Sequence, residues 1–412
     1  MALIVQKYGG TSVADVGRMK AVARRVADCY REGNQVVVVV SARGDTTDEM
    51  IELARQISLH PPEREMDMLL ATGEQQSIAL LAMAIQTLGL PVVSLTGPQV
   101  AIITDGVHAK ARIIQVQTER LTRELEAGKI VIVAGFQGIS GDNEITTLGR
   151  GGSDTTAVAL AAALGAEVCE IYTDVDGVYT ADPRVIPEAG KLTSISYDEM
   201  LELASLGAQV LQPRSVEFAK QYGVQLHVRS SFNQNPGTLV WEGQGMEREM
   251  AVTGVACDLN VAKIGIFGVP DRPGVAARLF GSLAARSINV DMIVQSTTAG
   301  ERNDISFTVG RTDLEQAVAT VKQVIGEVGA SGFTTDAGVA KVSIVGAGMI
   351  TNPGVAAQMF AALAQEAINI DMISTSEIKV SCVIRQEAAT QAVRALHRAF
   401  RLGEAAELAV GT

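Results

Sequence analysis

Short apolar runs alternate with helical stretches from residue 2 to about residue 240, and this alternation constrains the fold more than any other feature. The runs expected to be strands are Leu3–Gln6, Val36–Ser41, Val92–Leu95, Ile130–Ala134, Cys169–Tyr172 and Gln225–Val228. The expected helices are Val16–Glu32, Thr47–Ile57, Arg64–Leu88, Lys110–Glu126, Thr155–Leu164 and Tyr197–Leu203. Apolar strands that alternate with helices predict a largely parallel sheet covered on both faces. We therefore expect an α/β fold with three αβα layers and a ligand site at the carboxyl ends of the strands.

Beyond a glycine-rich stretch at residues 237–245, the chain contains an internal repeat. Residues 273–293 and 353–373 are identical at 13 of 21 aligned positions. Each copy contains a strand, a Pro-Gly turn, a helix, two strands and a second helix, in that order. A supersecondary unit that recurs in this way predicts two small βαββαβ modules. Their first strands are expected at Lys263–Val269 and Lys341–Val345.

A βαββαβ module needs a fourth strand, and the two copies are expected to obtain it differently. The first copy can use Phe333–Asp336, but the second ends in a weakly patterned tail after Arg401. We predict that Ala251–Ala256, which precedes the first copy, completes the sheet of the second. The expected organisation is a first domain at 1–245, a linker and strand at 246–260, and modules at 261–338 and 339–412.

The composition excludes several classes of protein. A formal charge of −12 disfavours binding to nucleic acid or to an anionic membrane surface. The four cysteines are far apart and the four histidines lack metal-ligand spacing, so buried free thiols and no protein-built metal site are expected. The first residues lack the basic segment and apolar run of a signal peptide, and the longest apolar runs are only strand-sized. These features predict a cytoplasmic protein of two or three domains.

Residues 147–166 place an arginine, two glycines, a serine and an aspartate where a loop enters an Ala-rich helix. Gly151 and Gly152 allow a ligand to approach the backbone, and Ser153 can cap the helix. A helix N-terminus attracts phosphate or carboxylate oxygens, and Arg150 adds a planar fork for the same groups. Asp154 in this basic setting requires a polar partner or a reacting group. A capped helix after a glycine turn explains this stretch equally well by itself.

A second motif, Lys7-Tyr-Gly-Gly-Thr-Ser, directly follows the first predicted strand. Gly9 and Gly10 can offer backbone N–H groups to phosphate oxygens, and Lys7 can neutralise charge between the transferred and leaving phosphate groups. The lysine precedes the glycines, so the segment is not a Walker A motif. The alternative is a structural turn beside an exposed lysine.

Two polar residues after the second predicted strand suit a small zwitterionic substrate. Thr47 begins a helix, where its hydroxyl can hold a substrate carboxylate or cap the helix. Glu74 is expected to begin another helix, where it can bind a substrate ammonium group or complement the helix dipole.

Residues 172–184 form a turn-rich run after a predicted strand. Asp174, Asp176 and Asp182 suggest calcium, but their spacing lacks the distal glutamate of an EF-hand loop. A loop around a nucleotide fits better, with Tyr179 against the base and Arg184 near phosphate.

Taken in order, these motifs resemble those of aspartate kinases of the amino acid kinase family, over essentially the whole chain. The resemblance is carried by Lys7–Ser12, Ser41–Asp48, Gly135–Gly138, Thr147–Thr155, Tyr172–Arg184 and the paired C-terminal copies, which resemble ACT domains. It implies transfer of the γ-phosphoryl group of ATP, carried with Mg²⁺, to the side-chain carboxylate of L-aspartate. The product would be 4-phospho-L-aspartate, the first intermediate toward lysine, threonine, methionine and isoleucine.

The resemblance also implies roles for individual residues. Lys7 would neutralise the phosphoryl group in flight, and Asp154 would position Lys7 and the reacting groups. The residues implied around aspartate are Thr47, Glu74, Arg150, Gly151 and Ser153, with Arg150 on the α-carboxylate. The residues implied around ATP are Lys7, Gly9, Gly10, Ser41, Thr173, Asp174, Tyr179, Asp182, Arg184 and Gln209.

One position departs from the family pattern, because the family usually has a lysine where this chain has Gln209. A neutral amide forms hydrogen bonds but does not screen phosphate charge. We therefore expect weaker ATP binding than is usual in the family, or a compensating cation such as Arg214.

The duplicated Pro-Gly turn, with a matched Asn and Asp in each copy, resembles the amino-acid pocket of paired ACT modules. The resemblance implies feedback inhibition by lysine, threonine or both, and a homodimer or higher oligomer. The implied effector residues are Asp271, Gly274, Val275, Ala276, Asn289, Asp291, Gln295, Thr351, Asn352, Gly354, Val355, Asn369 and Asp371. The alternative is that these residues only shape the two ends of a helix. Met246 and Met250 stand where an internal start would yield a separate regulatory subunit.

Two competing functions remain at this point. One is a related kinase activity on glutamate, carbamate or a nucleoside monophosphate. The other is an amino-acid sensor with a degenerate kinase domain, a hypothesis that only Gln209 supports.

Overall fold

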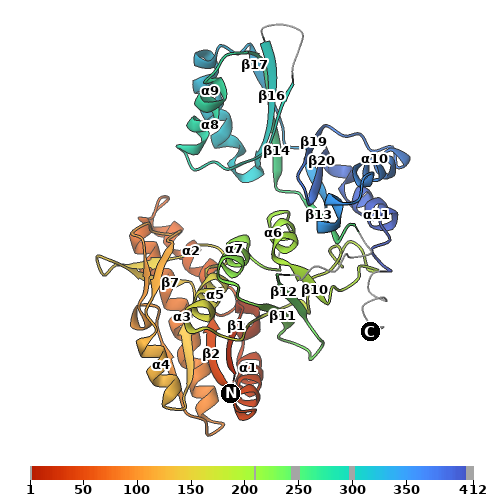
Figure 1. The fold of residues 1–412 in the computed structure, drawn as a ribbon. Coiled ribbons are helices and arrows are strands. Elements are labelled where there is room, and N and C mark those ends of the chain that lie inside the picture. Colours follow the sequence, from red (N-terminus) through yellow and green to blue (C-terminus); the bar gives the residue numbers. More distant parts are fainter. Residues whose placement is uncertain (1, 208–209, 243–250, 297–301, 405–412) are drawn as a thin grey trace. The chain divides into compact units, whose positions relative to one another are not determined.

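The computed structural model describes residues 2–207, 210–242, 251–296 and 302–404 (Figure 1). The chain divides into two compact units, neither of which is continuous in sequence. The first unit contains Met1–Val178, Lys191–Ser205 and Gln209–Gly245. The second unit contains Tyr179–Gly190, Leu206–Ala208 and Met246–Thr412.

An eight-stranded sheet forms the centre of the first unit, with strand order β10-β12-β11-β9-β1-β2-β6-β3. Neighbouring strands are parallel except β11 and β12, which are antiparallel. The strands are β1 (Leu3–Tyr8), β2 (Gln35–Val40), β3 (Val92–Leu95), β6 (Ile130–Ala134), β9 (Val168–Thr173), β10 (Ser194–Ser196), β11 (Leu226–Ser230) and β12 (Thr238–Trp241). The predicted, largely parallel sheet is therefore confirmed.

Helices cover both faces of this sheet, which makes the three predicted layers (Figure 1). Helices α1 (Val16–Arg31) and α3 (Glu63–Gln86) share a buried cluster with Tyr8 and Val38. Helix α5 (Gly152–Leu164) contacts β1, β2 and β9, and α7 (Pro213–Tyr222) packs against α5. Because side chains alternate along a strand, Lys7 points away from the face that carries Tyr8. The remaining helices of this unit are α2 (Thr46–Ile57), α4 (Glu119–Glu126), α6 (Tyr197–Ser205) and the 3-10 helices η1 (Gly10–Val13) and η2 (Pro98–Val100).

A second, four-stranded sheet of order β5-β4-β7-β8 was not predicted from the sequence. Its strands are β4 (Ile102–Thr104), β5 (Ile113–Val116), β7 (Gln137–Ser140) and β8 (Ile145–Thr147). The predicted helix Lys110–Glu126 is wrong in its first half, because only Glu119–Glu126 is helical. The β-branched residues of Ile113–Val116 favour a strand over a helix, which explains the difference.

Among the described residues, α3 is the one helix long and apolar enough to cross a membrane. Half of its apolar window is buried inside the protein. It also carries two fully or nearly fully buried carboxylates, Asp67 and Glu74. These properties are typical of the core helix of a globular domain.

The second unit contains the two predicted βαββαβ modules. The first has strand order β15-β16-β14-β17 and the second β13-β18-β20-β19. The elements of the first are β14 (Val261–Pro270), α8 (Val275–Ala284), β15 (Val290–Ser296), β16 (Arg302–Gly310), η3 (Arg311–Asp313), α9 (Leu314–Val328) and β17 (Gly332–Asp336). Those of the second are β13 (Gly254–Asp258), β18 (Val339–Val345), η4 (Ala347–Ile350), α10 (Val355–Gln365), β19 (Met372–Thr375), β20 (Lys379–Arg385), η5 (Gln386–Ala388) and α11 (Ala389–Ala399).

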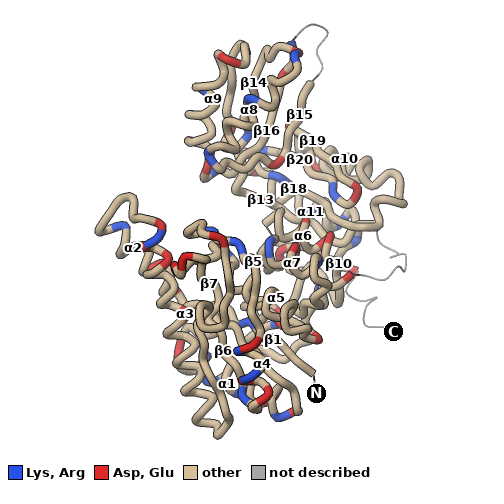
Figure 2. Tube along the Cα trace, turned by 60° about the vertical axis from the view of Figure 1, so that its left-hand side comes forward, with Lys and Arg blue, Asp and Glu red and all other residues tan. Residues whose placement is uncertain are grey.

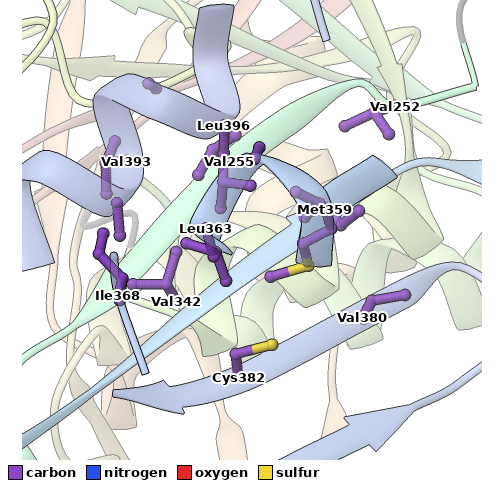
Figure 3. Close-up of a cluster of buried hydrophobic side chains, with 14 of the residues drawn as sticks. Val252, Val255, Val342, Met359, Leu363, Ile368, Val380, Cys382, Val393 and Leu396 are labelled. Atoms are coloured by element: carbon purple, nitrogen blue, oxygen red, sulfur yellow. The ribbon is translucent and has the colours of Figure 1, made fainter. Parts of the chain in front are cut away.

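The edge strand of the second module comes from chain that precedes the first module. Strand β13 pairs antiparallel with β18, with Gly254 opposite Val345 and Asp258 opposite Lys341. The strand begins three residues later than the Ala251–Ala256 segment expected to fill this place. Val252 and Val255 are buried in the core of the second module with Met359, Leu363 and Leu396 (Figure 3). The second module therefore includes chain from both sides of the first.

The two modules pack against each other through a small apolar cluster. Val261 and Met292 of the first module contact Val339, Met372 and Val383 of the second. Strands β14 and β15 contact β18 and β19, respectively. The two copies of the repeat thus pack into one unit.

A short segment of the N-terminal half belongs to this second unit. Ala181 and Ile186 are buried in the core cluster of the second module, and the Val255 N–H donates to the carbonyl oxygen of Thr180 at 2.8 Å. The Thr180 hydroxyl contacts the imidazole of buried His397 at 3.0 Å. The continuous first domain expected at 1–245 is therefore interrupted, because the chain enters the second unit at Tyr179–Gly190 and returns to the first at Lys191.

Charges of both signs are interspersed along the chain (Figure 2). The 46 acidic and 34 basic residues give the formal charge of −12. Local arrangement rather than net charge must therefore create any site for an anionic ligand.

Candidate active site

Lys7 and Asp154 form an ion pair at the edge of the main sheet where β1 ends. The distance between Lys7 Nζ and Asp154 Oδ1 is 2.6 Å, and the side chains are only 11% and 9% exposed. Lys7 is the penultimate residue of β1, and Asp154 lies in the first turn of α5. The N-terminus of α5 carries partial positive charge, so both the lysine and the helix favour an anion here. Two residues 147 positions apart in sequence therefore meet at one site, as the motifs predicted.

The turns that follow β1 and β2 are packed directly against each other. A Cβ atom at Gly10 would lie 2.7 Å from the carbonyl oxygen of Ala42, so no larger residue fits there. The Gly44 N–H donates to the Gly10 carbonyl at 3.1 Å, and the Ser41 N–H donates to the Tyr8 carbonyl at 3.1 Å. Gly9 is close to the Lys7 ammonium but less constrained, because an added Cβ would lie at an ordinary contact distance of 3.5 Å from Nζ. The structure therefore brings together four of the predicted nucleotide-site positions, Lys7, Gly9, Gly10 and Ser41.

The start of α5 lies against the end of β6. A Cβ atom at Gly135 would meet the Ser153 side chain at 2.6 Å. The prediction that Ser153 caps α5 is wrong, because Gly151 occupies the N-cap position and no side chain caps the helix. Ser153 is instead the second helical residue and is buried. The Gly152 and Asp154 N–H groups donate to the carbonyl oxygens of Gly149 and Gly151, whereas the Ser153 N–H has no acceptor among the described residues and can bind a ligand.

The loop before α5 is shaped by two glycines in the left-handed region, with φ values of 77° at Gly149 and 68° at Gly151. Between them, Arg150 is exposed and makes no ion pair with any residue in the described ranges. A guanidinium without an ion-pair partner, next to an uncapped helix N-terminus, is suited to bind a carboxylate or phosphate.

Gly151 offers a direct test of this loop. An alanine there must adopt a positive φ, and its Cβ would lie 1.8 Å from Gln212 Cγ. We expect Gly151→Ala to shift the loop and to raise the KM for the anionic substrate about 10-fold or more. Gly165→Ala is the matched control, because Gly165 has a similar φ of 63° but no atom within 4 Å of an added Cβ. Equal KM values in the two variants would argue against a role for the loop.

Glu74 is a buried carboxylate with one free oxygen. Its Oε1 accepts the Ala42 N–H at 3.0 Å, whereas its Oε2 has no hydrogen-bond partner within the described residues. Burial raises the pKa of Glu74 to about 7, although two backbone hydrogen bonds, from Ala42 and from its own N–H, oppose the shift. The prediction that Glu74 begins a helix is wrong, because it lies in the middle of α3. Its alternative role as a helix-dipole charge is thereby excluded, and the free oxygen calls for a donor from a ligand.

Thr47 lies in the first turn of α2 and is partly exposed. No side chain caps this helix, and the neighbouring Thr46 hydroxyl donates to the Arg43 carbonyl. The capping role considered for Thr47 is therefore not observed. Its hydroxyl forms no hydrogen bond with another described residue and can therefore bind a ligand.

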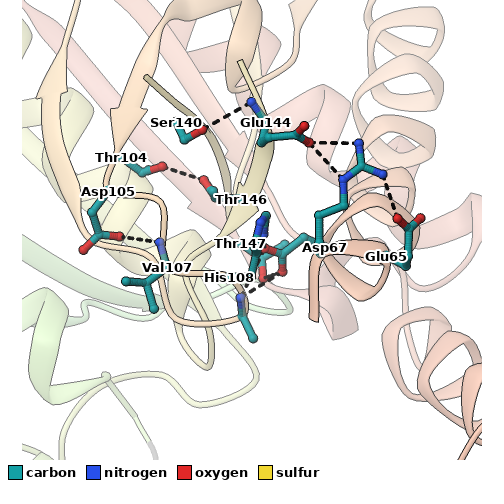
Figure 4. Close-up of polar contacts among 12 residues, drawn as sticks. Glu65, Asp67, Thr104, Asp105, Val107, His108, Ser140, Glu144, Thr146 and Thr147 are labelled. Carbon is teal, nitrogen blue, oxygen red and sulfur yellow. Dashed lines mark hydrogen bonds and ion pairs between the residues drawn. The ribbon is translucent and has the colours of Figure 1, made fainter. Parts of the chain in front are cut away.

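A polar network that the sequence analysis missed supports the loop from the other side (Figure 4). Asp67 of α3 is fully buried and accepts hydrogen bonds from the Thr147 hydroxyl at 2.5 Å and from the Ala109 N–H at 3.1 Å. His108 Nδ1 lies 2.7 Å from the same carboxylate. A single buried aspartate thus joins α3, the turn at 108–109 and the end of β8. A single aspartate inside a predicted helix does not indicate from the sequence alone that it will connect other elements of the fold.

The nucleotide-loop residues are only partly placed. Thr173 ends β9, and its hydroxyl donates to Asp174 at 3.0 Å. Tyr179, Asp182 and Arg184 belong to the second unit, and Gln209 lies outside the described residues. The Arg184 guanidinium donates hydrogen bonds to the Asp182 carboxylate from both Nε and Nη2, which lowers the pKa of Asp182. The predicted ATP roles of these four residues stay predictions.

Arg214 does not stand free as a compensating cation for Gln209. Its guanidinium donates to the carbonyl oxygens of Leu148 and Ala111 at 2.9 and 2.8 Å.

The predicted effector residues occupy equivalent places in the two modules. Gly274 and Gly354 are the N-cap residues of α8 and α10, with φ values of 95° and 100° that disfavour other residues. The remaining residues of the set, Asp271, Val275, Ala276, Asn289, Asp291, Gln295, Thr351, Asn352, Val355, Asn369 and Asp371, lie near these helix starts or on the following strands. Most of them are exposed.

The two matched aspartates of this set already have partners. Asp291 of the first module forms an ion pair with Lys341 of the second, and Asp371 of the second lies 3.7 Å from Lys263 of the first. Lys263 lies in β14 of the first module and Lys341 in β18 of the second, and each is paired with the aspartate of the other module. The pairs therefore hold the module interface together, a role that the sequence analysis did not foresee.

Comparisons with known proteins agree with this geometry. A model of the amino acid kinase family matches residues 2–230, and an ACT domain model matches residues 264–324 and 342–400. The aspartokinase of Bacillus sp. (strain MGA3) is 54% identical over 98% of this chain and 99% of its own length. The chain belongs to the aspartokinase family. It is accordingly an ATP-dependent kinase with C-terminal ACT domains.

Two solved structures that are similar to this chain contain bound ligands. Aspartokinase III of E. coli in complex with aspartate and ADP (R-state) is 26% identical, with a TM-score of 0.82 and coverage of 97% of this chain and 100% of that one. The same enzyme in complex with lysine and aspartate (T-state) is 27% identical, with a TM-score of 0.75 and coverage of 97% and 99%.

Proposed function

We propose that this kinase transfers the γ-phosphoryl group of ATP to the side-chain carboxylate of L-aspartate and releases 4-phospho-L-aspartate and ADP. The observation that carries the proposal is the buried Lys7–Asp154 pair beside the uncapped N-terminus of α5. A lysine and a helix N-terminus at one anion site can stabilise the charge that develops during phosphoryl transfer.

The substrate amino acid is proposed to bind beside this pair. Arg150 is free of ion pairs among the described residues and is suited to the α-carboxylate, while the free oxygen of Glu74 is suited to the ammonium group. Thr47, Gly151 and Ser153 would contribute further donors. The E. coli relative was solved with aspartate and ADP, which supports the same ligand classes here.

The chemical step needs little acid–base catalysis. A substrate carboxylate is ionised at neutral pH and can attack without a strong general base. The new bond forms between its oxygen and the γ-phosphorus, the bond to the β-γ bridging oxygen breaks, and ADP leaves with that oxygen. Lys7 would screen the charge during transfer, and Asp154 would hold the ammonium in place. Mg²⁺ would arrive on ATP and neutralise its phosphates.

The C-terminal modules are proposed to bind lysine, threonine or both as feedback inhibitors. Support comes from the matching ACT model and from the E. coli relative solved with lysine. The reaction would begin lysine and threonine biosynthesis in the cytoplasm. We further propose a homodimer or higher oligomer formed through the ACT modules.

Trapping of the acyl phosphate tests the proposed reaction. Purified protein, Mg²⁺ and ATP are incubated with hydroxylamine and either L-aspartate or L-glutamate, and the hydroxamate is measured. We expect hydroxamate with aspartate and at least about 10-fold less with glutamate, since one extra methylene displaces the reacting carboxylate. Equal products would indicate a less selective kinase, and none would indicate a sensor.

A further inference from the structure

Arg214 is a half-buried cation bound to two carbonyl oxygens. It is the second residue of α7, and its two terminal nitrogens donate to Leu148 and Ala111 at 2.9 and 2.8 Å. No carboxylate forms an ion pair with it among the described residues. Burial lowers the pKa of the Arg214 guanidinium, and nearby Arg112 adds to the effect, while Asp105 and Glu217 oppose it. Burying a charge without an ion pair is costly, so the two hydrogen bonds indicate a specific role.

The two carbonyls belong to segments that are already joined. The Ala111 N–H donates to the Thr147 carbonyl at 2.9 Å, and the Leu148 N–H donates to the Phe136 carbonyl at 2.8 Å. Thr147 is also held by Asp67 through its hydroxyl. Leu148, immediately before the Gly149–Gly151 loop, is therefore fixed at its N–H by Phe136 in the turn between β6 and β7 and at its C=O by Arg214.

The same turn of α7 also contacts the other end of the loop. The Gln212 side chain lies where a Cβ atom at Gly151 would be placed, with Cγ at 1.8 Å. Arg214 thus holds the residue two positions before Arg150, and Gln212 packs against the residue after it. Arg150 is exposed and lies in a loop whose two ends, at Leu148 and Gly151, both contact residues at the start of α7.

We propose that Arg214 is a positioning residue for the substrate carboxylate, because its guanidinium fork joins Leu148 to Ala111 and so fixes the loop that presents Arg150. This inference rests on the proposed function, in which Arg150 binds the α-carboxylate of aspartate. Arg214 itself donates to main-chain oxygens and acts through Arg150. A guanidinium is suited to the task because its planar fork spans two acceptors at once.

The alternative is that Arg214 contributes only its charge, as a long-range attraction for anionic substrates. The two roles predict different behaviour of Arg214→Lys, which keeps the charge and loses the fork. A charge role predicts that lysine restores the wild-type KM. A positioning role predicts that lysine fails as glutamine does.

The experiment measures steady-state kinetics of the full chain and of Arg214→Lys, Arg214→Gln and the control Arg112→Gln. Arg112 neighbours Ala111 and is exposed, so its removal changes the local charge without breaking the clamp. We expect both Arg214 variants to raise the aspartate KM about 10-fold while the ATP KM changes less than about 2-fold. Arg112→Gln is expected to leave both constants within about 2-fold of wild type.

Hydrogen exchange of the peptide that contains residues 147–153 supplies a readout that does not depend on the substrate. We expect faster exchange in both Arg214 variants and unchanged exchange in Arg112→Gln. A wild-type aspartate KM in Arg214→Lys, or unchanged exchange in this peptide, overturns the inference. If the wild-type protein forms no acyl phosphate but the exchange changes as expected, the proposed function fails while the loop clamp stands.

Discussion

Replacing Lys7 with methionine is expected to lower kcat about 10³-fold while the protein stays folded. Lys7 is buried, and its ammonium lies 2.6 Å from Asp154 in the first turn of α5. Loss of one preorganised donor to a developing charge typically reduces kcat about 10²- to 10³-fold, and the loss of a full charge belongs at the upper end. The hydroxamate assay measures kcat directly, because the acyl phosphate is the product of the chemical step.

The substitution also leaves Asp154 without its ion-pair partner in a nearly buried position, which can cost about 3–5 kcal/mol. The double variant Lys7→Met/Asp154→Asn removes this unpaired charge and separates the catalytic effect from the effect on stability. Lys20→Met, at an exposed position of α1, is the matched control and is expected to behave as wild type. A folded Lys7→Met protein with kcat within about 10-fold of wild type contradicts the proposed role.

The second large effect is expected at Glu74, where one substitution should stabilise the ligand-free protein and impair substrate binding. Burial raises the pKa of Glu74 from 4.5 in the unfolded chain to about 7. The folded state therefore holds this proton more tightly, and the associated stability is present below pH 4.5 and lost as the pH rises through 7. A shift of this size corresponds to about 3 kcal/mol at alkaline pH.

Glu74→Gln keeps the shape of the side chain and removes its ionisation. We expect the free energy of unfolding of the variant, relative to that of the wild type, to rise by about 2–3 kcal/mol as the pH goes from 5 to 8. Denaturant titrations followed by fluorescence of Trp241 measure this gain, because the single tryptophan lies in β12 of the first unit. At pH 8 the aspartate KM of the variant is expected to rise about 10-fold or more, since the ammonium loses a charged acceptor.

The pH dependence gives the sharper comparison. The aspartate KM of the wild type is expected to fall as the pH rises through about 7, and that of Glu74→Gln is expected to stay flat there. Glu63→Gln, exposed at the start of the same helix, is the control. A stability difference between Glu74→Gln and wild type that does not change with pH would rule out the raised pKa.

Patterns that depend on one strand or one helix could be predicted from the sequence. The strand Ile130–Ala134 is observed with the predicted bounds, because a run of consecutive β-branched and apolar residues is typical of a doubly covered strand. The meeting of Lys7 and Asp154 was also accessible, because Lys7 lies at the carboxyl end of a strand of the main sheet and Asp154 opens a helix after a glycine-rich turn, and such segments gather at this edge of an α/β sheet. The duplicated modules followed from the repeat itself.

Features that depend on tertiary contacts could not be predicted from local patterns. Ile113–Val116 is a strand of a second sheet, although the surrounding residues favour a helix. Asp67 and Arg214 lie within helices, and only the fold shows that they hold Thr147 and Leu148. The pairing of Asp291 with Lys341 depends on the packing of one module against the other, which a linear repeat does not reveal.

A structure of the protein with L-aspartate, Mg²⁺ and a non-hydrolysable ATP analogue tests the central claim most directly. The account predicts Lys7 Nζ at about 3 Å from an oxygen of the terminal phosphoryl group, with aspartate between Arg150 and Glu74. Nucleotide and aspartate ordered elsewhere, with Lys7 still paired only to Asp154, would contradict it.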